Sequence, residues 1–439
     1  MTRTLMCHIL YHFNTYHMQE LKQNDIVNLT NGSTAKVIKE LGRGGQGIVY
    51  LVDLAGQKMA LKWYTEQHDQ KFYKNLEDNI LKGAPSNAFL WPEYLTMREK
   101  GSFGYIMQLR PTEYYEFKHY LLAKVKFASM EVILNAAMKI CEGFMILHRF
   151  GYSYQDLNEG NFFIHPTTGD VLICDNDNVV PDGERSGMRG KARYMAPEIM
   201  TGNSLPNKYS DRYSLSVVLF LLFYCNHPLE GSRVLACPCM TEAFEKKFFG
   251  SDAIFIYDEK NTTNRPVRGV HNNVLKRWPV FPQLLRDTFK TEFGEECLKD
   301  PTKRMLDSTW QKIIQQLRDM LVVCPECGEE TFVEDINVPK CMNCGKTIHI
   351  SGALRILNRD ILLTPKTRVY CDMDNKSDML VVSIPGDKFP VQIMNTTSVD
   401  WTVETPSGKL RQIPPKAAMP VKAGLKLSYG NVKGEIIEF

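Results

Sequence analysis

The sequence lacks two features that would point to a partner from composition alone. Its 53 lysines and arginines are nearly balanced by 50 aspartates and glutamates, so the formal charge of +3 creates no general field toward nucleic acid or a membrane surface. Long apolar runs are also missing, because the longest extends only from Tyr213 to Tyr224, which predicts a buried helix and not a membrane span. Since the chain shows no export signal, we expect a cytoplasmic protein without a nucleic-acid partner.

A disulfide framework is a third absence. Most of the 12 cysteines are scattered singly, which suits a reducing compartment. The exceptions are two C-x-x-C pairs, Cys324 with Cys327 and Cys341 with Cys344. Paired knuckles present four thiolates to a tetrahedral Zn²⁺, so we predict a structural zinc ribbon over residues 321–350. The alternative is four unrelated reduced cysteines.

The order of patterns along the chain predicts several domains, since 439 residues exceed one ordinary domain. Residues 36–63 alternate apolar and polar positions, which predicts a β-sheet lobe, whereas residues 112–224 show helical spacing. Short β-like runs separated by Pro/Gly turns follow the cysteines. We therefore predict an α+β protein with an extension and first strand (1–35, of which 1–17 form an unstructured lead-in), a two-lobed domain (36–320, with lobes 36–107 and 111–320), the zinc ribbon (321–350) and a small all-β sandwich (351–439).

A glycine hairpin lies inside the predicted β lobe. It reads G-x-G-x-x-G-x-V through Gly42, Gly44, Gly47 and Val49. Because glycine has no side chain, backbone N–H groups can lie close to phosphates there, with a plain turn as the alternative. Lys62 favours the phosphate interpretation, since it stands at the end of a following strand within reach of a triphosphate. The alternative for Lys62 is an ordinary solvated lysine.

The partner expected for Lys62 is a carboxylate on the next predicted helix, because such a pair holds the lysine against the phosphates. Glu77 stands beside the apolar positions Leu76 and Ile80 and is our candidate. Asp78 is the rival, and a solvated helix face is the other alternative.

Two acidic loops follow the β lobe. Asp156 and Asn161 come directly before an apolar strand, and Asp175 comes directly after the next one. Phosphoryl transfer needs a base beside the attacking hydroxyl and cations around the phosphates, and carboxylate and amide oxygens suit Mg²⁺. Together with the glycine hairpin and Lys62, these loops resemble the catalytic and metal-binding loops of Hanks-type protein kinases.

This resemblance implies a two-lobed protein-kinase fold and transfer of the γ-phosphate of ATP, with Mg²⁺ or Mn²⁺, to a protein hydroxyl. It implies that Asp156 orients the attacking hydroxyl and accepts its proton, while Asn161 and Asp175 hold the metal. Further residues at the nucleotide, again by resemblance, are Ala60, Met107, Gln108 and Leu109.

The same resemblance gives three residues structural roles. Glu198, in an Ala-Pro-Glu motif, pairs in the family with an arginine that corresponds to Arg304, and the buried pair braces the helical lobe. Asp211 corresponds to an aspartate that holds the backbone of the catalytic loop. No chemistry is expected of these side chains.

Two departures from the kinase pattern affect control of the active site. Tyr154 and Gln155 replace the usual His-Arg, which removes the main anchor for a phosphorylated activation loop. Asn176 and Asp177 replace Phe-Gly after Asp175. We expect less movement of this loop, with Asp177 as a candidate for a further metal ligand.

A third departure affects charge. Asn158 occupies the position at which serine/threonine kinases keep a lysine against the γ-phosphate, and a neutral amide cannot supply that charge. Lys191 aligns with a position on the opposite loop that faces the catalytic loop. We hypothesise that Lys191 restores the missing cation, and the alternative is a solvated loop lysine.

The tail and the combination of domains carry two more resemblances. The segments 401–403 and 419–430 resemble the closing strands of a forkhead-associated β-sandwich, with a generic interaction module as the alternative. The kinase motifs, the Phe89–Pro92 segment and the zinc ribbon together resemble the bacterial kinases of the TerY phosphorylation triad, whose implied partners are a von Willebrand factor A protein and a metal-dependent phosphatase.

We predict an active serine/threonine kinase of a bacterial signalling system. The alternative is a pseudokinase or nucleotide-sensing scaffold acting through its zinc ribbon and β domain.

Overall fold

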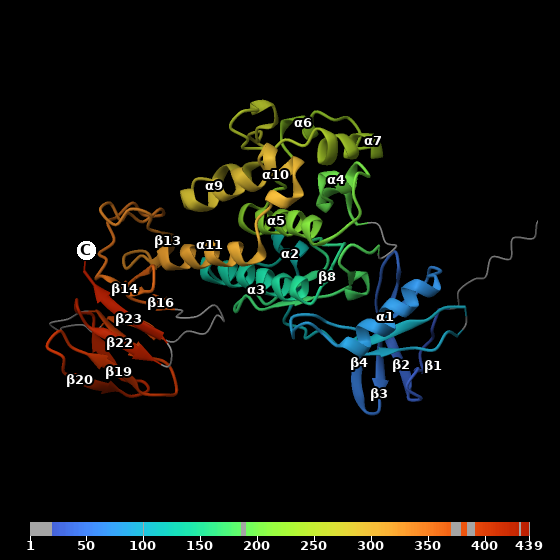
Figure 1. Ribbon diagram of the computed structural model, residues 1–439, viewed down its shortest axis with the longest axis horizontal. Helices are drawn as coiled ribbons and strands as arrows, with labels where there is room; N and C mark the ends of the chain where they lie inside the picture. Colours follow the sequence, from blue (N-terminus) through green and yellow to red (C-terminus); the bar gives the residue numbers. More distant parts are fainter. Residues whose placement is uncertain are drawn as a thin grey trace, which may run out of the picture. The chain divides into compact units, whose positions relative to one another are not determined.

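The computed structural model describes residues 20–99, 101–185, 190–369, 379–383, 391–429 and 432–438. The predicted lead-in of residues 1–17 lies outside these ranges. The chain divides into two compact units, one comprising residues 1–84 with 90–111 and the other comprising residues 85–89 with 112–439 (Figure 1).

The first unit is a β-sheet lobe with one helix. Its sheet has the order β1-β2-β3-β4-β6-β5, and alternating side chains such as Val37, Ile48 and Leu61 form its apolar core. Gly47 must be glycine, because a Cβ at this position would lie 2.4 Å from the carbonyl oxygen of Trp63. The elements are β1 (Ile26–Asn28), β2 (Thr34–Arg43), β3 (Gly47–Leu54), β4 (Gln57–Tyr64), α1 (Gln70–Lys82), β5 (Tyr94–Leu95) and β6 (Gly104–Gln108).

The second unit begins with a helical region built around α5 (Lys208–Tyr224). A capping box at Asn207 and Ser210 starts this helix, and nearly all of its residues are buried, which confirms the prediction of a buried helix over Tyr213 to Tyr224. The other helices of this region are α2 (Phe117–Leu121), α3 (Met130–Arg149), α4 (Pro197–Met200), α6 (Ser232–Leu235), α7 (Glu242–Lys246), α8 (Asn272–Arg277), α9 (Gln283–Glu292), α10 (Glu295–Lys299) and α11 (Asp307–Met320).

Short strands in the helical region hold its loops in place. The sheet β10-β9-β7 and the pair β11-β8 flank the segment 154–161 and the residues that follow Ile173. Both predicted acidic loops therefore leave from strand ends. The strands are β7 (Tyr115–Glu116), β8 (Tyr152–Ser153), β9 (Phe162–Ile164), β10 (Val171–Ile173) and β11 (Val180–Pro181).

The remainder of the second unit is β structure. The hairpin of β12 (Leu321–Val323) and β13 (Glu330–Phe332) follows α11 directly. Two sheets, β15-β14-β23-β22-β19-β20 and β16-β17-β18-β21, then share an apolar core that includes Trp401 and Ile393. Their strands are β14 (Ala353–Ile356), β15 (Arg359–Leu362), β16 (Arg368–Val369), β17 (Met379–Ser383), β18 (Val391–Asn395), β19 (Trp401–Glu404), β20 (Leu410–Ile413), β21 (Ala418–Pro420), β22 (Lys426–Tyr429) and β23 (Val432–Ile437).

Among the described residues, no helix combines the length and the apolar character needed to cross a membrane.

Candidate active site

The predicted phosphate loop and Lys62 lie together in the first unit. The loop joins β2 to β3, and the N–H of Gly44 donates to the carbonyl of Gly47 over 2.9 Å. Lys62 lies opposite Val49 in the pairing of β4 with β3 and is only 5% exposed. Its Nζ donates to Oε1 of Gln46, which belongs to the loop, over 3.2 Å. A buried ammonium group therefore faces the loop that would hold phosphates.

The other predicted nucleotide residues of the first unit lie on β4 and β6. Ala60 lies opposite Met107 in this pairing, and both side chains are buried. Gln108 is exposed and donates from Nε2 to Glu93 Oε1 over 2.8 Å. Leu109 is also exposed. Their role at a nucleotide stays a prediction.

Glu77 differs from the expectation. The buried face of α1 carries Phe72, Leu76 and Asn79, whereas the Glu77 side chain is 44% exposed. Its carboxylate accepts from Lys74 Nζ at 2.7 Å, and the rival Asp78 pairs with the same lysine at 3.0 Å. The structure thus places the carboxylate that was predicted for Lys62 on the exposed helix face.

In the second unit, the catalytic loop is held by its backbone. Asp211 of α5 accepts from the backbone N–H groups of Tyr154 at 2.6 Å and Gln155 at 3.1 Å, which confirms its expected role. The carbonyl of Asp156 accepts from Asn161 Nδ2 at 2.8 Å and from Asn158 Nδ2 at 3.0 Å. Both asparagines therefore fix the position from which the Asp156 side chain leaves the backbone.

The Asp156 carboxylate lies in an environment that disfavours its charged form. Its Oδ1 is buried and has no hydrogen-bond partner among the residues that the structure describes. Burial and then the negative charge of Asp175 raise the pKa of Asp156 to about 6, although Lys191 opposes this shift. Two carboxyl groups in one buried region favour a cation, and a hard divalent ion such as Mg²⁺ fits their oxygens.

A backbone hydrogen bond connects the segment that carries Asp175 with the segment that carries Asn161. The N–H of Cys174 donates to the carbonyl of Asn161 over 2.9 Å, so the two acidic loops lie side by side. Asp175 has a φ of 55°, a left-handed conformation that is uncommon for a residue with a side chain. Such strain is often found where a side chain must point in one direction for function.

Lys191 reaches the catalytic loop. Its Nζ donates to Asn158 Oδ1 over 2.8 Å and lies 3.6 Å from Glu159 Oε1. Gly160 leaves room for this contact, because a Cβ there would lie 3.0 Å from Asn158 Oδ1 and 3.7 Å from Lys191 Nζ. The structure therefore brings the hypothesised cation to the asparagine that it was expected to complement.

Tyr154 and Gln155, the replacements for His-Arg, make contacts of their own. The Tyr154 hydroxyl donates to the carbonyl of Cys174, and the Gln155 amide donates to Ser153 Oγ and to the carbonyl of Glu184. These bonds tie the catalytic loop to Cys174, directly before Asp175, and to the segment beyond β11 without a phosphate group.

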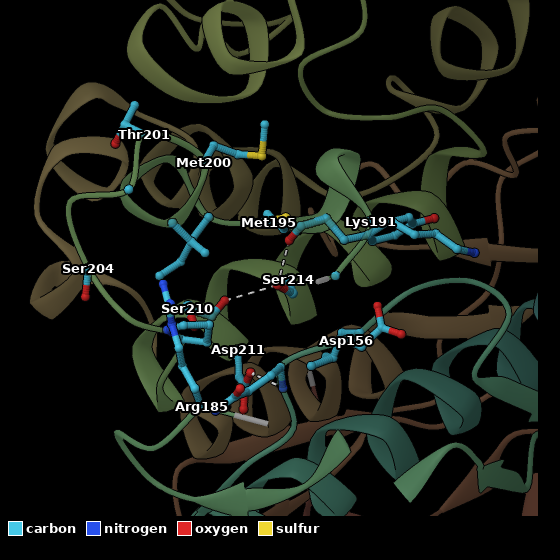
Figure 2. A pocket seen from close by; sticks show the side chains of 18 of the residues that line it. Asp156, Arg185, Lys191, Met195, Met200, Thr201, Ser204, Ser210, Asp211 and Ser214 are labelled. Carbon is cyan, nitrogen blue, oxygen red and sulfur yellow. Dashed lines mark hydrogen bonds between the residues drawn. The ribbon is translucent and has the colours of Figure 1, made fainter. Parts of the chain in front are cut away.

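A cavity of about 460 Å³ opens beside Asp156. Figure 2 shows Asp156 and Lys191 on one side of it and Met200, Thr201 and Ser204 on the other. Ser214, one of the residues that line the cavity, donates from Oγ to the carbonyl of Tyr194 over 2.6 Å. The cavity thus lies next to the catalytic loop and has Asp156 and Lys191 in its lining.

Glu198 and Arg304 form the expected ion pair. Arg304 is 3% exposed and donates from both Nη atoms to the two Glu198 oxygens, over 2.8 and 2.7 Å. The guanidinium also donates to the carbonyls of Tyr209 and Cys297. The predicted brace is confirmed.

His148 is a residue that the sequence analysis missed. Its Nδ1 lies 2.9 Å from Asp307 Oδ2 and its Nε2 lies 3.3 Å from Asp211 Oδ2. These two carboxylates raise the pKa of His148 to about 9, in spite of its burial. A lone histidine near the end of an apolar helix gave no signal of this bridge.

The four cysteines form a cluster that fits a zinc ion. Their Sγ atoms all lie within 4.8 Å of one another, with Cys324 and Cys344 3.8 Å apart and Cys327 and Cys341 3.6 Å apart. Four thiolates at about 2.3 Å from a tetrahedral Zn²⁺ would be about 3.8 Å apart. The spacing and the ligand type suit a structural site, and the described part of the chain adds no fifth candidate ligand to this cluster.

Comparisons with known proteins agree with this geometry. Serine/threonine-protein kinase 40 of Mus musculus and of Homo sapiens is 27% identical over 121 residues, which make up 26% of this chain and 27% of each relative. A probable serine/threonine-protein kinase of Dictyostelium discoideum is 23% identical over 226 residues, 47% of this chain and 15% of the relative. The chain therefore spans 27% or less of the length of these relatives. The family model for the protein kinase domain matches residues 35–315, well over half of the chain, and the chain belongs to the protein kinase family.

Proposed function

We propose that this chain is an ATP-dependent protein kinase that phosphorylates serine or threonine. The observation that carries the proposal is the Asp156 carboxylate, whose buried Oδ1 has no hydrogen-bond partner among the described residues. A buried acceptor without a donor destabilises the fold by roughly 1–3 kcal/mol. A substrate hydroxyl would supply the missing donor, which gives this unfavourable arrangement a use.

The remaining roles follow from the chemistry of each side chain. We propose that Lys62 binds the α- and β-phosphates, and that Asn161 and Asp175 hold a Mg²⁺ or Mn²⁺ ion. The metal, when bound, neutralises charge on the β- and γ-phosphate oxygens. Asp156 accepts the proton of the attacking hydroxyl, whose oxygen bonds to the γ-phosphorus while the bond to the β–γ bridging oxygen breaks and ADP leaves. The adenine side of the nucleotide is assigned to Ala60, Met107, Gln108 and Leu109.

Lys191 is proposed as a further catalytic cation. Its 2.8 Å contact with Asn158 Oδ1 supports this role, since Asn158 stands where related kinases keep a lysine. The Glu159 carboxylate at 3.6 Å helps to hold the ammonium group beside the catalytic loop. The charge then comes from the loop opposite the one that usually supplies it.

The biological setting is a proposal from resemblance. The cysteine cluster that follows α11 supports the resemblance to the TerY-triad kinases, which rests on the kinase motifs and a following zinc ribbon. On this basis we propose a cytoplasmic kinase of a bacterial signalling system, with a von Willebrand factor A protein and a metal-dependent phosphatase as substrate and antagonist. The tail is proposed as a forkhead-associated-like interaction module.

Incubation with Mg²⁺ and [γ-³²P]ATP tests the proposed function. The wild-type protein should label itself or a general protein substrate, the label should be on serine or threonine, and Asp156→Asn should abolish it. Label on tyrosine alone would contradict the assigned specificity. No label above the Asp156→Asn background, with nucleotide still bound, would favour a scaffold.

One observation supports that second candidate, a nucleotide-sensing scaffold. Glu77 pairs with Lys74 at 2.7 Å on the exposed face of α1, so the carboxylate expected for Lys62 is engaged elsewhere. Lys62 with a phosphate loop can still bind nucleotide in such an arrangement. The variant Glu77→Gln distinguishes the two candidates. In a kinase that recruits Glu77 during turnover, the substitution should reduce kcat. In a scaffold, it should leave the nucleotide affinity unchanged.

A further inference from the structure

The zinc-ribbon hairpin places carboxylates at the start of two helices of the kinase domain. Glu330 on β13 accepts from the backbone N–H groups of Met130 and Glu131, the first two residues of α3, the second over 3.3 Å. Glu334, just after β13, accepts from the N–H of Gln283, the first residue of α9. The first N–H groups of a helix have no partner inside the helix, and negative charge there is favourable.

The Glu330 contact completes the start of α3. The next N–H group, of Val132, donates to Ser129 Oγ over 3.2 Å, and that of Ile133 donates to the Ser129 carbonyl over 3.4 Å. Bond formation inside the helix thus begins at Ile133, and the three N–H groups before it are all bonded to side chains, two of them to one that is almost two hundred residues away in the sequence. α3 depends on the ribbon for two of these three N-terminal capping bonds.

The predicted metal cluster determines where Glu330 lies. Glu330 pairs with Val323 in the β12–β13 hairpin, whose connection carries the first cysteine pair, and the N–H of Cys324 donates to the carbonyl of Glu329 over 2.9 Å. The neighbouring Thr331 accepts, at Oγ1, from the N–H of Met342 in the second knuckle over 3.2 Å. A metal that holds both knuckles thus also holds the strand that carries Glu330.

The opposite end of α3 reaches the catalytic loop. His148, in the last turn of α3, bridges Asp307 at the start of α11 and Asp211, which in turn binds the N–H groups of Tyr154 and Gln155 next to Asp156. α3 and α11 pack together, and α11 continues into β12 (Figure 1). Both helices therefore connect the anchor of the catalytic loop with the ribbon hairpin.

We propose that Glu330 is a positioning residue for phosphoryl transfer, acting through α3 on the catalytic loop, and that the metal-bound ribbon keeps it in place. This inference rests on the proposed kinase function. In this arrangement the ribbon helps to position the catalytic loop. Loss of the metal would therefore slow phosphoryl transfer without a change in the nucleotide-binding residues.

The experiment uses the full-length zinc-loaded protein and three forms: wild type, Glu330→Gln, and Glu329→Gln as the matched control. Glu329 precedes Glu330 and is exposed, so its replacement alters charge on the same hairpin without the cap. Hydrogen exchange of the amides of residues 130–132 should become about five- to tenfold faster in Glu330→Gln and stay unchanged in Glu329→Gln. The kcat should fall about three- to tenfold in Glu330→Gln while KM for ATP stays constant.

Chelation of zinc from the wild type should accelerate exchange of the same amides and lower kcat, and it should add little to the effect of Glu330→Gln. Faster exchange with an unchanged kcat would overturn the positioning role, because Glu330 would then be a structural cap only. Equal behaviour of the two variants, or no effect of chelation on residues 130–132, would overturn it as well. A wild type that transfers no phosphate but shows the exchange effects would refute the proposed function separately.

Discussion

Replacing Lys191 with alanine removes a cation whose Nζ lies 2.8 Å from Asn158 Oδ1. If Nζ stands about 4 Å from a γ-phosphate oxygen, the attraction between two unit charges is about 4 kcal/mol at an effective dielectric constant of about 20. The Lys191 side chain is 53% exposed, so solvent screening reduces this value. Removal of one group that stabilises transition-state charge costs about 2.7–4 kcal/mol, and we take the lower end of this range, about 2.7 kcal/mol. Since about 1.4 kcal/mol changes a rate tenfold, kcat should fall about 100-fold.

Steady-state kinetics with varied Mg-ATP measure this effect. Lys246→Ala is the matched control, because Lys246 lines the same cavity and pairs with Glu242 at 3.5 Å, away from Asn158. It should leave kcat within about twofold of wild type. In the Lys191→Ala background, Asn158→Lys should recover much of the lost activity, because it returns a cation to the position that related kinases use.

A kcat for Lys191→Ala within about threefold of wild type would exclude Lys191 as a catalytic cation, since a charge needed in the transition state cannot be removed at so small a cost. The same holds if Lys246→Ala and Lys191→Ala lose equal activity. In either case Lys191 would be an ordinary loop lysine that happens to contact an asparagine.

Four further predictions concern pH, stability and metal. Asp156 must be unprotonated to act as a base, so kcat should fall as pH drops through about 6, and a pH profile without an acid limb would contradict this role. Because the folded pKa lies above the ordinary 3.8, ionised Asp156 destabilises the protein at neutral pH, and Asp156→Asn should raise the free energy of urea unfolding by about 2–3 kcal/mol. Glu198→Ala should lower it by about 3–5 kcal/mol, because it leaves the buried Arg304 unpaired, and an unchanged midpoint would contradict the brace. Native mass spectrometry should find one zinc per chain, absent in Cys324→Ser, and chelation should lower the melting temperature.

Features with a local signal could be predicted from the sequence. The kinase domain, the buried helix α5 and the pair of Glu198 with Arg304 are confirmed, because motif order and apolar runs leave few other arrangements. The cysteine knuckles come together as their spacing indicates. The roles assigned to Lys62 and to the acidic loops stay predictions, although their backbones are held as such roles require.

The position of Glu77 on α1 differs from the prediction that local sequence patterns gave. It follows the buried Leu76 by one residue, which turns it about 100° around the helix and away from the face that carries Phe72 and Asn79. Apolar neighbours on both sides suggested that it lies at the edge of the buried face. The burial of the polar Asn79 beside Phe72 and Leu76 fixes the rotation of α1, and the apolar pattern alone did not indicate it.

Long-range contacts that belong to no motif could not be predicted. Glu330 caps α3 from almost two hundred residues away in the sequence, and no local pattern distinguishes it from the exposed Glu329 beside it. His148 likewise acquires its role from two carboxylates that are distant in the sequence. Such contacts depend on the tertiary fold, which brings a helix end and a strand to one place.

The decisive measurement for a catalytic role of Asp156 is the rate of phosphate transfer at saturating Mg-ATP, compared between wild type and Asp156→Asn. We expect a loss of about 10²- to 10⁴-fold in Asp156→Asn with unchanged nucleotide affinity, because the base is removed while the phosphate-binding residues stay. Equal rates in the two proteins, or no transfer by either at a concentration that binds ATP, would show that Asp156 is not the base of a kinase.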